Sequence, residues 1–141
     1  MIVVAGGALI NQITAAAAHA YPEECCGLLV GQRGGEAVHI TQVVESPNIA
    51  TNRWRRFEVD PALRLAMMRR LRGTAEEIVG HYHSHPDGPP QPSGHDAAMA
   101  FETQLIWLVV AVVRGVAGRP GAFLYDRNAG CFRNLALQVA D

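Results

Sequence analysis

The chain shows two hydrophobic periodicities. Apolar residues three to four positions apart are typical of a helix with one buried face. Short runs of alternating or continuous apolar residues are typical of β-strands. The first pattern predicts helices over Ala8–Ala20, from Asp60 to Gly73, and over Ser93–Thr103. The second predicts strands over Cys26–Val30, Ala37–Glu45, Arg56–Val59, Glu77–His83, Leu105–Val113, Ala122–Tyr125 and, as an edge strand, Cys131–Val139.

This mixture of elements predicts an α/β fold with a central mixed β-sheet flanked by helices. No internal repeat and no Ser/Gly-rich linker divides the chain. We therefore expect a single domain over residues 1–141. Asp60 followed by Pro61 is typical of a helix start, with Asp60 as the N-cap.

Composition excludes several classes of protein. The chain is 49% hydrophobic and 18% charged, which is typical of a folded domain rather than a disordered one. Its net charge of −1 argues against a polybasic nucleic-acid binder. The longest apolar run, Leu105–Val113, is far shorter than the roughly 20 residues that cross a bilayer. We expect neither a nucleic-acid nor a membrane partner.

Three cysteines, an odd number, favour a reducing compartment over a disulfide framework. Cys25, Cys26 and Cys131 do not form a CxxC zinc motif. The simplest interpretation is that they are small apolar side chains buried in strands. A cytoplasmic location follows as the expectation.

A histidine-rich segment ends the strand predicted over Glu77–His83. His83 and His85 are two residues apart, so their side chains are expected on the same face of a strand. Two imidazoles on one face can hold a metal ion at about 2.0–2.1 Å. The alternative is that His81, His83 and His85 form a polar face by chance.

Asp96 is the natural candidate for a third ligand, because the Pro-rich loop over His85–Pro92 can fold it back onto the strand end. Two His and one Asp with an open fourth position are typical of catalytic rather than structural zinc sites. A water at that position can reach a pKa of about 7 and act as a nucleophile. Ser93 and Asp96 also resemble a helix capping box, which is compatible with the metal role.

A general base is missing from this set. Glu23 and Glu24 precede the strand that begins at Cys26. A carboxylate there can approach the metal if that strand pairs beside the histidine strand. Both residues can equally be solvated charges at a helix end, so spacing alone leaves the base open.

Together these motifs resemble the JAMM (MPN-plus) metalloprotease family. The family signature is a distant Glu, then His-x-His, seven residues that begin with Pro, and Ser-x-x-Asp. Every signature position matches, in the segments Glu24–Gly27, His83–His85, Pro86–Pro92 and Ser93–Asp96. The resemblance covers roughly Leu9 to Arg127, including Asn48 and the helix entry at Phe57–Pro61.

The resemblance implies a cytidine-deaminase-like MPN/JAMM fold and a zinc-dependent peptidase or isopeptidase. It implies that the Zn²⁺ ligands are His83, His85 and Asp96, that the base is Glu24, and that the hydrogen-bond donor to the oxyanion is Ser93. Glu23 is out of register with the signature Glu. His81 and His95 have no signature role, and we expect them on the surface of their strand and helix.

Members of this family cut amide bonds at the C-terminus of ubiquitin or ubiquitin-like proteins. The chain is similar to small bacterial members that process sulfur-carrier proteins, so the expected partner is the C-terminal tail of such a carrier. One alternative is a non-catalytic interaction module of the same fold, and another is a zinc amidase acting on a small molecule. The arginines between Arg53 and Arg72 form either a site for an acidic partner or a solvated helix face.

Overall fold

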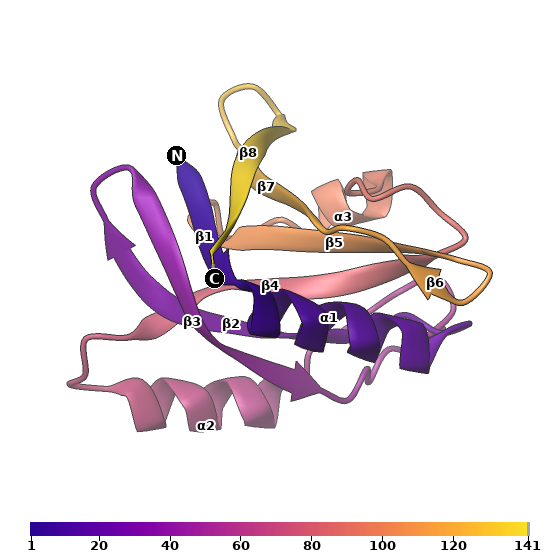
Figure 1. The fold of residues 1–141 in the computed structure, drawn as a ribbon, viewed down its shortest axis with the longest axis horizontal. Helices are drawn as coiled ribbons and strands as arrows, with labels where there is room; N and C mark the ends of the chain where they lie inside the picture. The colour runs from indigo at the N-terminus through magenta and orange to yellow at the C-terminus, as the bar shows by residue number, and fades with distance from the viewer. Residues whose placement is uncertain (141) are drawn as a thin grey trace.

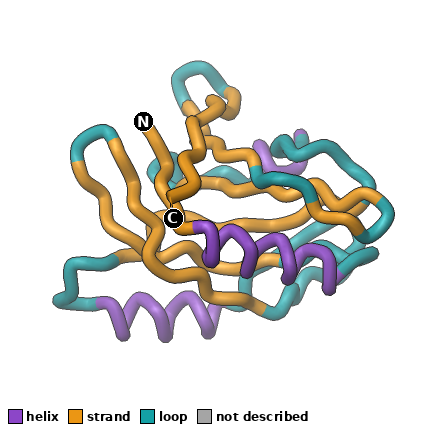
Figure 2. Tube along the Cα trace, viewed as in Figure 1, coloured by secondary structure: helices purple, strands orange, loops and turns teal. Residues whose placement is uncertain are grey.

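The structure is a computed structural model that describes residues 1–140. Three helices and eight strands follow one another along these residues (Figures 1 and 2). Their bounds are β1 (Ile2–Gly6), α1 (Gly7–Ala20), β2 (Cys26–Gly34), β3 (Ala37–Ser46), α2 (Pro61–Leu71), β4 (Glu77–Pro86), α3 (Gly94–Ala98), β5 (Ile106–Val113), β6 (Val116–Ala117), β7 (Gly121–Asp126) and β8 (Cys131–Ala140).

All eight strands belong to one mixed sheet, in the order β4-β2-β3-β1-β8-β7-β5-β6. Strand β1 pairs in parallel with β3 and β8, and β4 pairs in parallel with β5. The remaining pairs are antiparallel. Because β4 pairs with both β2 and β5, the row of strands closes on itself and leaves only β6 attached at one side. The predicted mixed sheet flanked by helices is confirmed.

Alternating residues of β2 face two different clusters of buried residues. Leu29 of β2 belongs to the core under α1, with Ile13 and Ala17 of that helix. Its neighbour Leu28 points to the other face and packs with Met67 of α2. Figure 1 shows α1 lying across the sheet and α2 on a separate side. The two helices therefore cover opposite faces of β2, as the period of two in a strand requires.

Strand β4 contains one extra residue relative to β2. Leu29 pairs with Gly80, whereas Val30 pairs with Ile78, so Val79 has no partner in β2. An irregularity of this kind reverses which side chains face which side beyond it. It places the odd-numbered residues from His81 onward on the α2 side of the sheet.

Several predicted elements were wrong in extent or in kind. Residues Arg56–Val59 do not form a strand, and Val59 makes only an isolated bridge to Asn48. The third helix is five residues long and ends at Ala98 rather than at Thr103. Strand β8 is not an edge strand, because it lies between β7 and β1. Strand β1, which has no counterpart in the predicted elements, supplies its second neighbour.

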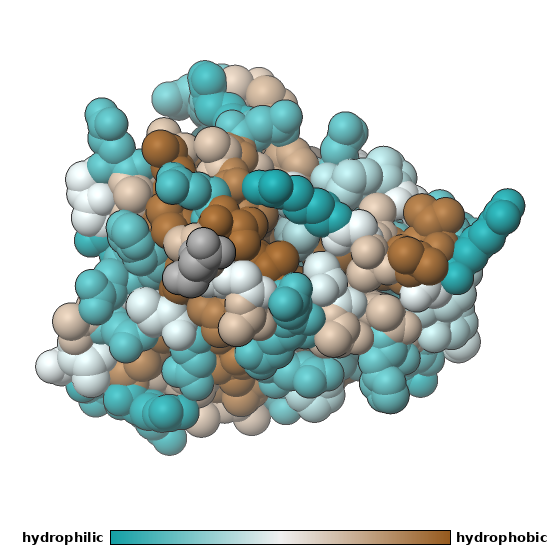
Figure 3. All heavy atoms as spheres, viewed as in Figure 1, coloured by the Kyte–Doolittle hydropathy of each residue, from teal (hydrophilic) through white to brown (hydrophobic). Residues whose placement is uncertain are grey.

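Cysteine burial follows the prediction in two cases of three. Cys26 is buried at the start of β2 and Cys25 is buried just before it, whereas Cys131 is exposed at the start of β8. Figure 3 shows a mixed face, with hydrophobic side chains gathered where β1 and β8 lie and again at the end where β6 lies, and hydrophilic side chains between and around them. Val113 and Val116 are exposed there. Within residues 1–140, the structure has no helix with the length and apolar character needed to cross a membrane.

Candidate metal centre

The end of β4 brings the two predicted histidine ligands together. His83 is completely buried and His85 is partly exposed. Their side chains share one face of the strand, and their Nε2 atoms lie 3.1 Å apart. The twofold repeat of a strand therefore produces the pairing that the sequence predicted.

Asp96 reaches the same point from the first turn of α3. Its Oδ2 lies 3.1 Å from Nε2 of His83 and 3.2 Å from Nε2 of His85. The capping box fixes this carboxylate, because Ser93 Oγ accepts the amide N–H of Asp96 at 3.1 Å. The Ser93 amide N–H in turn donates to Asp96 Oδ2 at 2.8 Å. The Asp96 side chain thus completes the capping box and forms a corner of the cluster.

The three atoms are spaced as the ligands of a small cation would be. Ligands at about 2.0–2.1 Å from a tetrahedral ion lie about 3.3–3.4 Å from one another. The three observed separations, 3.1, 3.1 and 3.2 Å, are close to that edge length. Two imidazole nitrogens and one carboxylate oxygen are also the donor types that suit Zn²⁺ and similar ions. The residues present therefore fit a divalent metal with one position left open.

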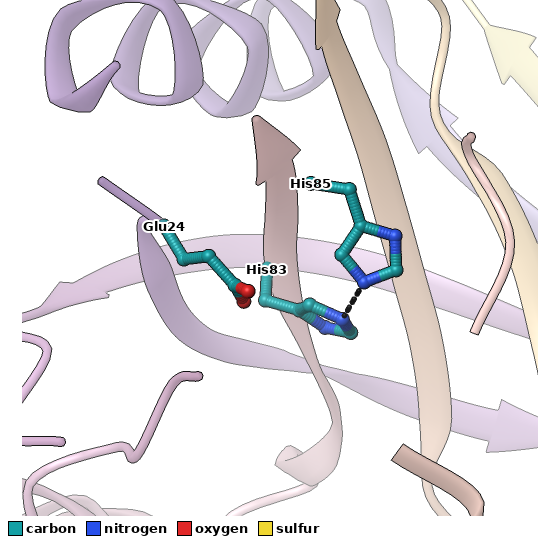
Figure 4. Close-up of side chains that lie close together, drawn as sticks. All are labelled: Glu24, His83 and His85. Atoms are coloured by element: carbon teal, nitrogen blue, oxygen red, sulfur yellow. Dashed lines mark hydrogen bonds between the residues drawn. The ribbon is translucent and has the colours of Figure 1, made fainter. Parts of the chain in front are cut away.

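Glu24 approaches the histidine pair from the residue before Cys25 and β2. One of its carboxylate oxygens and one ring nitrogen each of His83 and His85 all lie within 4.8 Å of one another. Figure 4 shows the Glu24 carboxylate pointing toward the His83 ring. The predicted approach occurs because β2 pairs with β4, where Cys26 lies opposite His83.

Burial changes the proton affinity of these groups in the metal-free chain. It raises the pKa of Glu24 from 4.5 to about 7, although the nearby His85 opposes this rise. Burial also lowers the pKa of His83. Burial alone would raise the pKa of Asp96, but hydrogen bonds with both histidines and with Ser93 hold it well below its usual range. In the metal-free chain the Glu24 carboxylate can therefore take up and release a proton near neutral pH.

The two histidines are held in different ways. Nδ1 of His85 lies 2.9 Å from the carbonyl oxygen of Pro89. A carbonyl only accepts, so Nδ1 carries the proton and Nε2 is left free for a cation. Nδ1 of His83 has no hydrogen-bond partner among residues 1–140. Its ring stacks instead on Phe57, with centroids 4.1 Å apart.

Phe57 is a site residue that sequence reasoning did not identify as one. The sequence predicts a strand over Arg56–Val59, and nothing in the spacing of Phe57 indicates contact with His83. His81 was also misplaced, because its ring packs edge-on against Trp107 at 4.3 Å and Nδ1 is inaccessible to solvent. Burial lowers the pKa of His81 to about 3, so this ring is neutral. The strand surface that we expected for His81 is partly covered by Phe57 and Trp107, and the residue remains partly exposed.

The other predicted positions lie as follows. His95 is exposed on α3, as expected. Glu23 forms an ion pair with Arg53, with Arg53 Nε 3.4 Å from a carboxylate oxygen of Glu23. Ser93 is exposed beside the cluster, and its oxygen already accepts one hydrogen bond. Its hydroxyl proton remains available to a ligand.

A cavity of about 300 Å³ opens next to the cluster. Asp96 contributes to its wall, so a molecule bound in it lies close to the candidate metal position. The rest of the wall is mostly apolar, with a few polar side chains, which is typical of ligand sites. Its lining includes His81, His95, Asp96, Met99, Leu105 and Trp107.

Known proteins resemble this chain over most of its length. The family model described as prokaryotic homologs of the JAB domain matches residues 7–124. A desampylase from Haloferax volcanii is 30% identical over 92 residues, which is 62% of this chain and 62% of the relative. A CysO-cysteine peptidase from Mycobacterium tuberculosis is 27% identical over 107 residues, covering 73% of this chain and 68% of the relative. The matched region thus spans about three fifths of the desampylase.

The fold has a close counterpart among solved structures. A protein from Desulfitobacterium hafniense superposes with a TM-score of 0.85 at 25% identity, covering 100% of this chain and 94% of that one. The family match covers more than half of the chain, and the histidine pair, Asp96 and Glu24 converge as described above. The chain therefore belongs to the family of prokaryotic homologues of the JAB domain.

Proposed function

We propose that this chain is a zinc-dependent JAMM peptidase that hydrolyses an amide bond at the C-terminus of a ubiquitin-like or sulfur-carrier protein. One observation carries the proposal: Nε2 of His83, Nε2 of His85 and Oδ2 of Asp96 form a triangle with edges of 3.1–3.2 Å. A Glu24 carboxylate oxygen lies within 4.8 Å of the histidine nitrogens. A three-ligand site with an adjacent base is the arrangement of hydrolytic zinc enzymes.

In this proposal His83, His85 and Asp96 are the ligands. Bound Zn²⁺ would supply a Lewis acid for the scissile carbonyl and would acidify a water molecule. Glu24 accepts the proton of the attacking water and then delivers it to the leaving amine. The Ser93 hydroxyl donates a hydrogen bond to the developing oxyanion, a contribution that can be worth about 3–4 kcal/mol.

The substrate class is supported by relatives and by surface charge. The similar proteins include one named a desampylase and one named a CysO-cysteine peptidase. An extended C-terminal tail can enter a narrow site that a folded protein cannot. Arg69 and Arg70, in the last turn of α2, are exposed and form no ion pair within residues 1–140. They are available to an acidic surface of the carrier.

Metal analysis combined with a cleavage assay tests the proposal. We expect about one Zn²⁺ per chain in the wild type, and loss of it in His83→Ala and Asp96→Ala. Glu24→Gln should keep the metal and lose cleavage of CysO that carries a C-terminal cysteine. A wild type without stoichiometric metal, after growth with sufficient zinc, would refute the proposal. Metal binding with no cleavage of any carrier would favour a different zinc hydrolase or an interaction module.

A further inference from the structure

The side chain of Asn48 uses all of its hydrogen-bonding capacity. Its Nδ2 donates to the carbonyl oxygens of Glu24 at 3.0 Å and of Arg56 at 2.9 Å. Its Oδ1 accepts the amide N–H groups of Ala50 and Glu58, both at 3.1 Å. A primary amide offers two donors and two acceptor lone pairs, and here each is used. One half-buried residue thus joins the Glu24 segment to the loop between β3 and α2.

The peptide group between Glu24 and Cys25 is held at both edges. Its carbonyl accepts from Asn48, as described, and its N–H donates to Ser84 Oγ at 2.8 Å. Ser84 is completely buried and lies between the two candidate ligands of β4. Its own amide N–H donates to the Cys25 carbonyl at 3.2 Å. Asn48 and Ser84 therefore fix the plane from which the Glu24 side chain projects.

Asn48 also holds the residue that covers His83. The two backbone groups that it binds in the loop belong to Arg56 and Glu58, which flank Phe57. Phe57 stacks on the His83 ring at 4.1 Å and 13° between planes. Nδ1 of this ring has no hydrogen-bond partner among the described residues, so packing is its main support. A single amide is thus connected to both sides of the cluster.

We propose that Asn48 is a positioning residue for the hydrolysis, with Ser84 as its partner on the opposite edge of the Glu24–Cys25 peptide. This inference rests on the proposed function. Among the described residues Asn48 forms no hydrogen bond to His83, His85 or Asp96, and it acts through Glu24 and Phe57. A base displaced by about 1 Å loses on the order of 100-fold in rate, because proton transfer requires a defined geometry. Removing one edge of the clamp should therefore lower turnover more than it lowers binding.

The test compares Asn48→Ala, Asn48→Asp and Ser84→Ala on CysO that carries a C-terminal cysteine. We expect each variant to lower kcat at least tenfold, with KM and the affinity for Co²⁺ changed less than threefold. Asn48→Asp keeps both acceptors and loses both donors. If it is as impaired as Asn48→Ala, the hydrogen bonds that Asn48 donates to Glu24 and Arg56 matter. If Asn48→Asp retains wild-type kcat, the bond to Glu24 is dispensable and the proposal is overturned.

A control separates positioning from stability. Thr74→Val removes a hydroxyl that donates to the Leu71 carbonyl at 2.7 Å, after α2. The Asn48 variants and this control are compared at the same loss of Tm. If kcat falls equally in both, Asn48 has only a structural role and the proposal fails. Ser84→Thr keeps the hydroxyl and should restore turnover relative to Ser84→Ala. In the double variant of Asn48 and Ser84, the loss of kcat should be smaller than the product of the single losses.

Amide hydrogen exchange tests whether Asn48 holds the Glu24 and Phe57 segments in place, and it does not depend on an activity assay. Asn48→Ala should speed exchange in residues 23–26 and 56–58 together, while the Thr74→Val control leaves both segments protected. Unchanged exchange in residues 23–26 would overturn the clamp. A wild type that cleaves no carrier would refute the proposed function instead, whatever the exchange shows.

Discussion

Replacing Glu24 by glutamine is expected to stabilise the metal-free protein at alkaline pH. Burial raises the pKa of Glu24 from 4.5 to about 7, so the folded chain holds this proton more tightly than the unfolded chain does. A rise of this size is worth about 3 kcal/mol, because one pKa unit corresponds to about 1.4 kcal/mol. The stability that the proton confers is fully present below pH 4.5 and is lost as the pH rises through about 7.

Glutamine has no proton to lose, so the variant escapes this penalty. The difference in free energy of unfolding between Glu24→Gln and the wild type should be near zero at about pH 4.5 and should approach about 3 kcal/mol at about pH 8. Urea unfolding of chelator-treated protein, followed by far-UV circular dichroism across this range, measures it. Saturating Zn²⁺ should remove the gain, because a nearby cation favours the ionised carboxylate of the wild type.

Glu23→Gln is the matched control. Glu23 is the adjacent carboxylate, and it is half-buried in an ion pair with Arg53 at 3.4 Å. Ion pairs as accessible to solvent as this one are worth about 0–1 kcal/mol, so this variant should be neutral or slightly less stable. Equal gains in both variants, or a gain in Glu24→Gln that does not depend on pH, would refute the reasoning. Either result would mean that burial of Glu24 does not oppose its ionisation.

Two further substitutions test the framework of the site. Gly80→Ala should lower the free energy of unfolding in urea by about 2 kcal/mol or more. The reason is that a methyl group built on Gly80 overlaps the carbonyl oxygen of Ile106 in the adjoining strand. A loss below about 0.5 kcal/mol would contradict this reasoning. Asp96→Ala should lower stability by about 1 kcal/mol through loss of the capping box, and a Co²⁺ titration should show at least tenfold weaker binding. Wild-type Co²⁺ affinity in this variant would exclude Asp96 as a ligand.

The part of the site that follows from local geometry could be predicted. Residues two apart on a strand must share a face, and this alone placed His83 beside His85. The approach of Asp96 to the histidine pair could also be predicted. The cap at Ser93 fixes where the helix starts, and this start does not depend on the length of the helix. The approach of Glu24 required β2 to pair with β4, which no local pattern in the sequence specifies.

The errors share a physical origin in tertiary contacts. Phe57 looked like part of a strand, yet its segment is held by the Asn48 side chain rather than by a neighbouring strand. Strand β8 was predicted as an edge strand, and it is indeed largely exposed, but it hydrogen-bonds to a neighbouring strand on both sides. The missing strand β1 is five residues long and runs directly into α1, so its pattern merges with that of the helix.

The position of Asp96 in the capping box means that occupancy of the cluster and order in α3 are physically linked. The same carboxylate oxygen accepts the Ser93 amide and faces both histidines. A cation that draws this oxygen toward itself competes with the amide for the same lone pairs. The rate at which the amides of this short helix exchange with solvent can therefore report how much metal the protein carries, without a spectroscopically active ion.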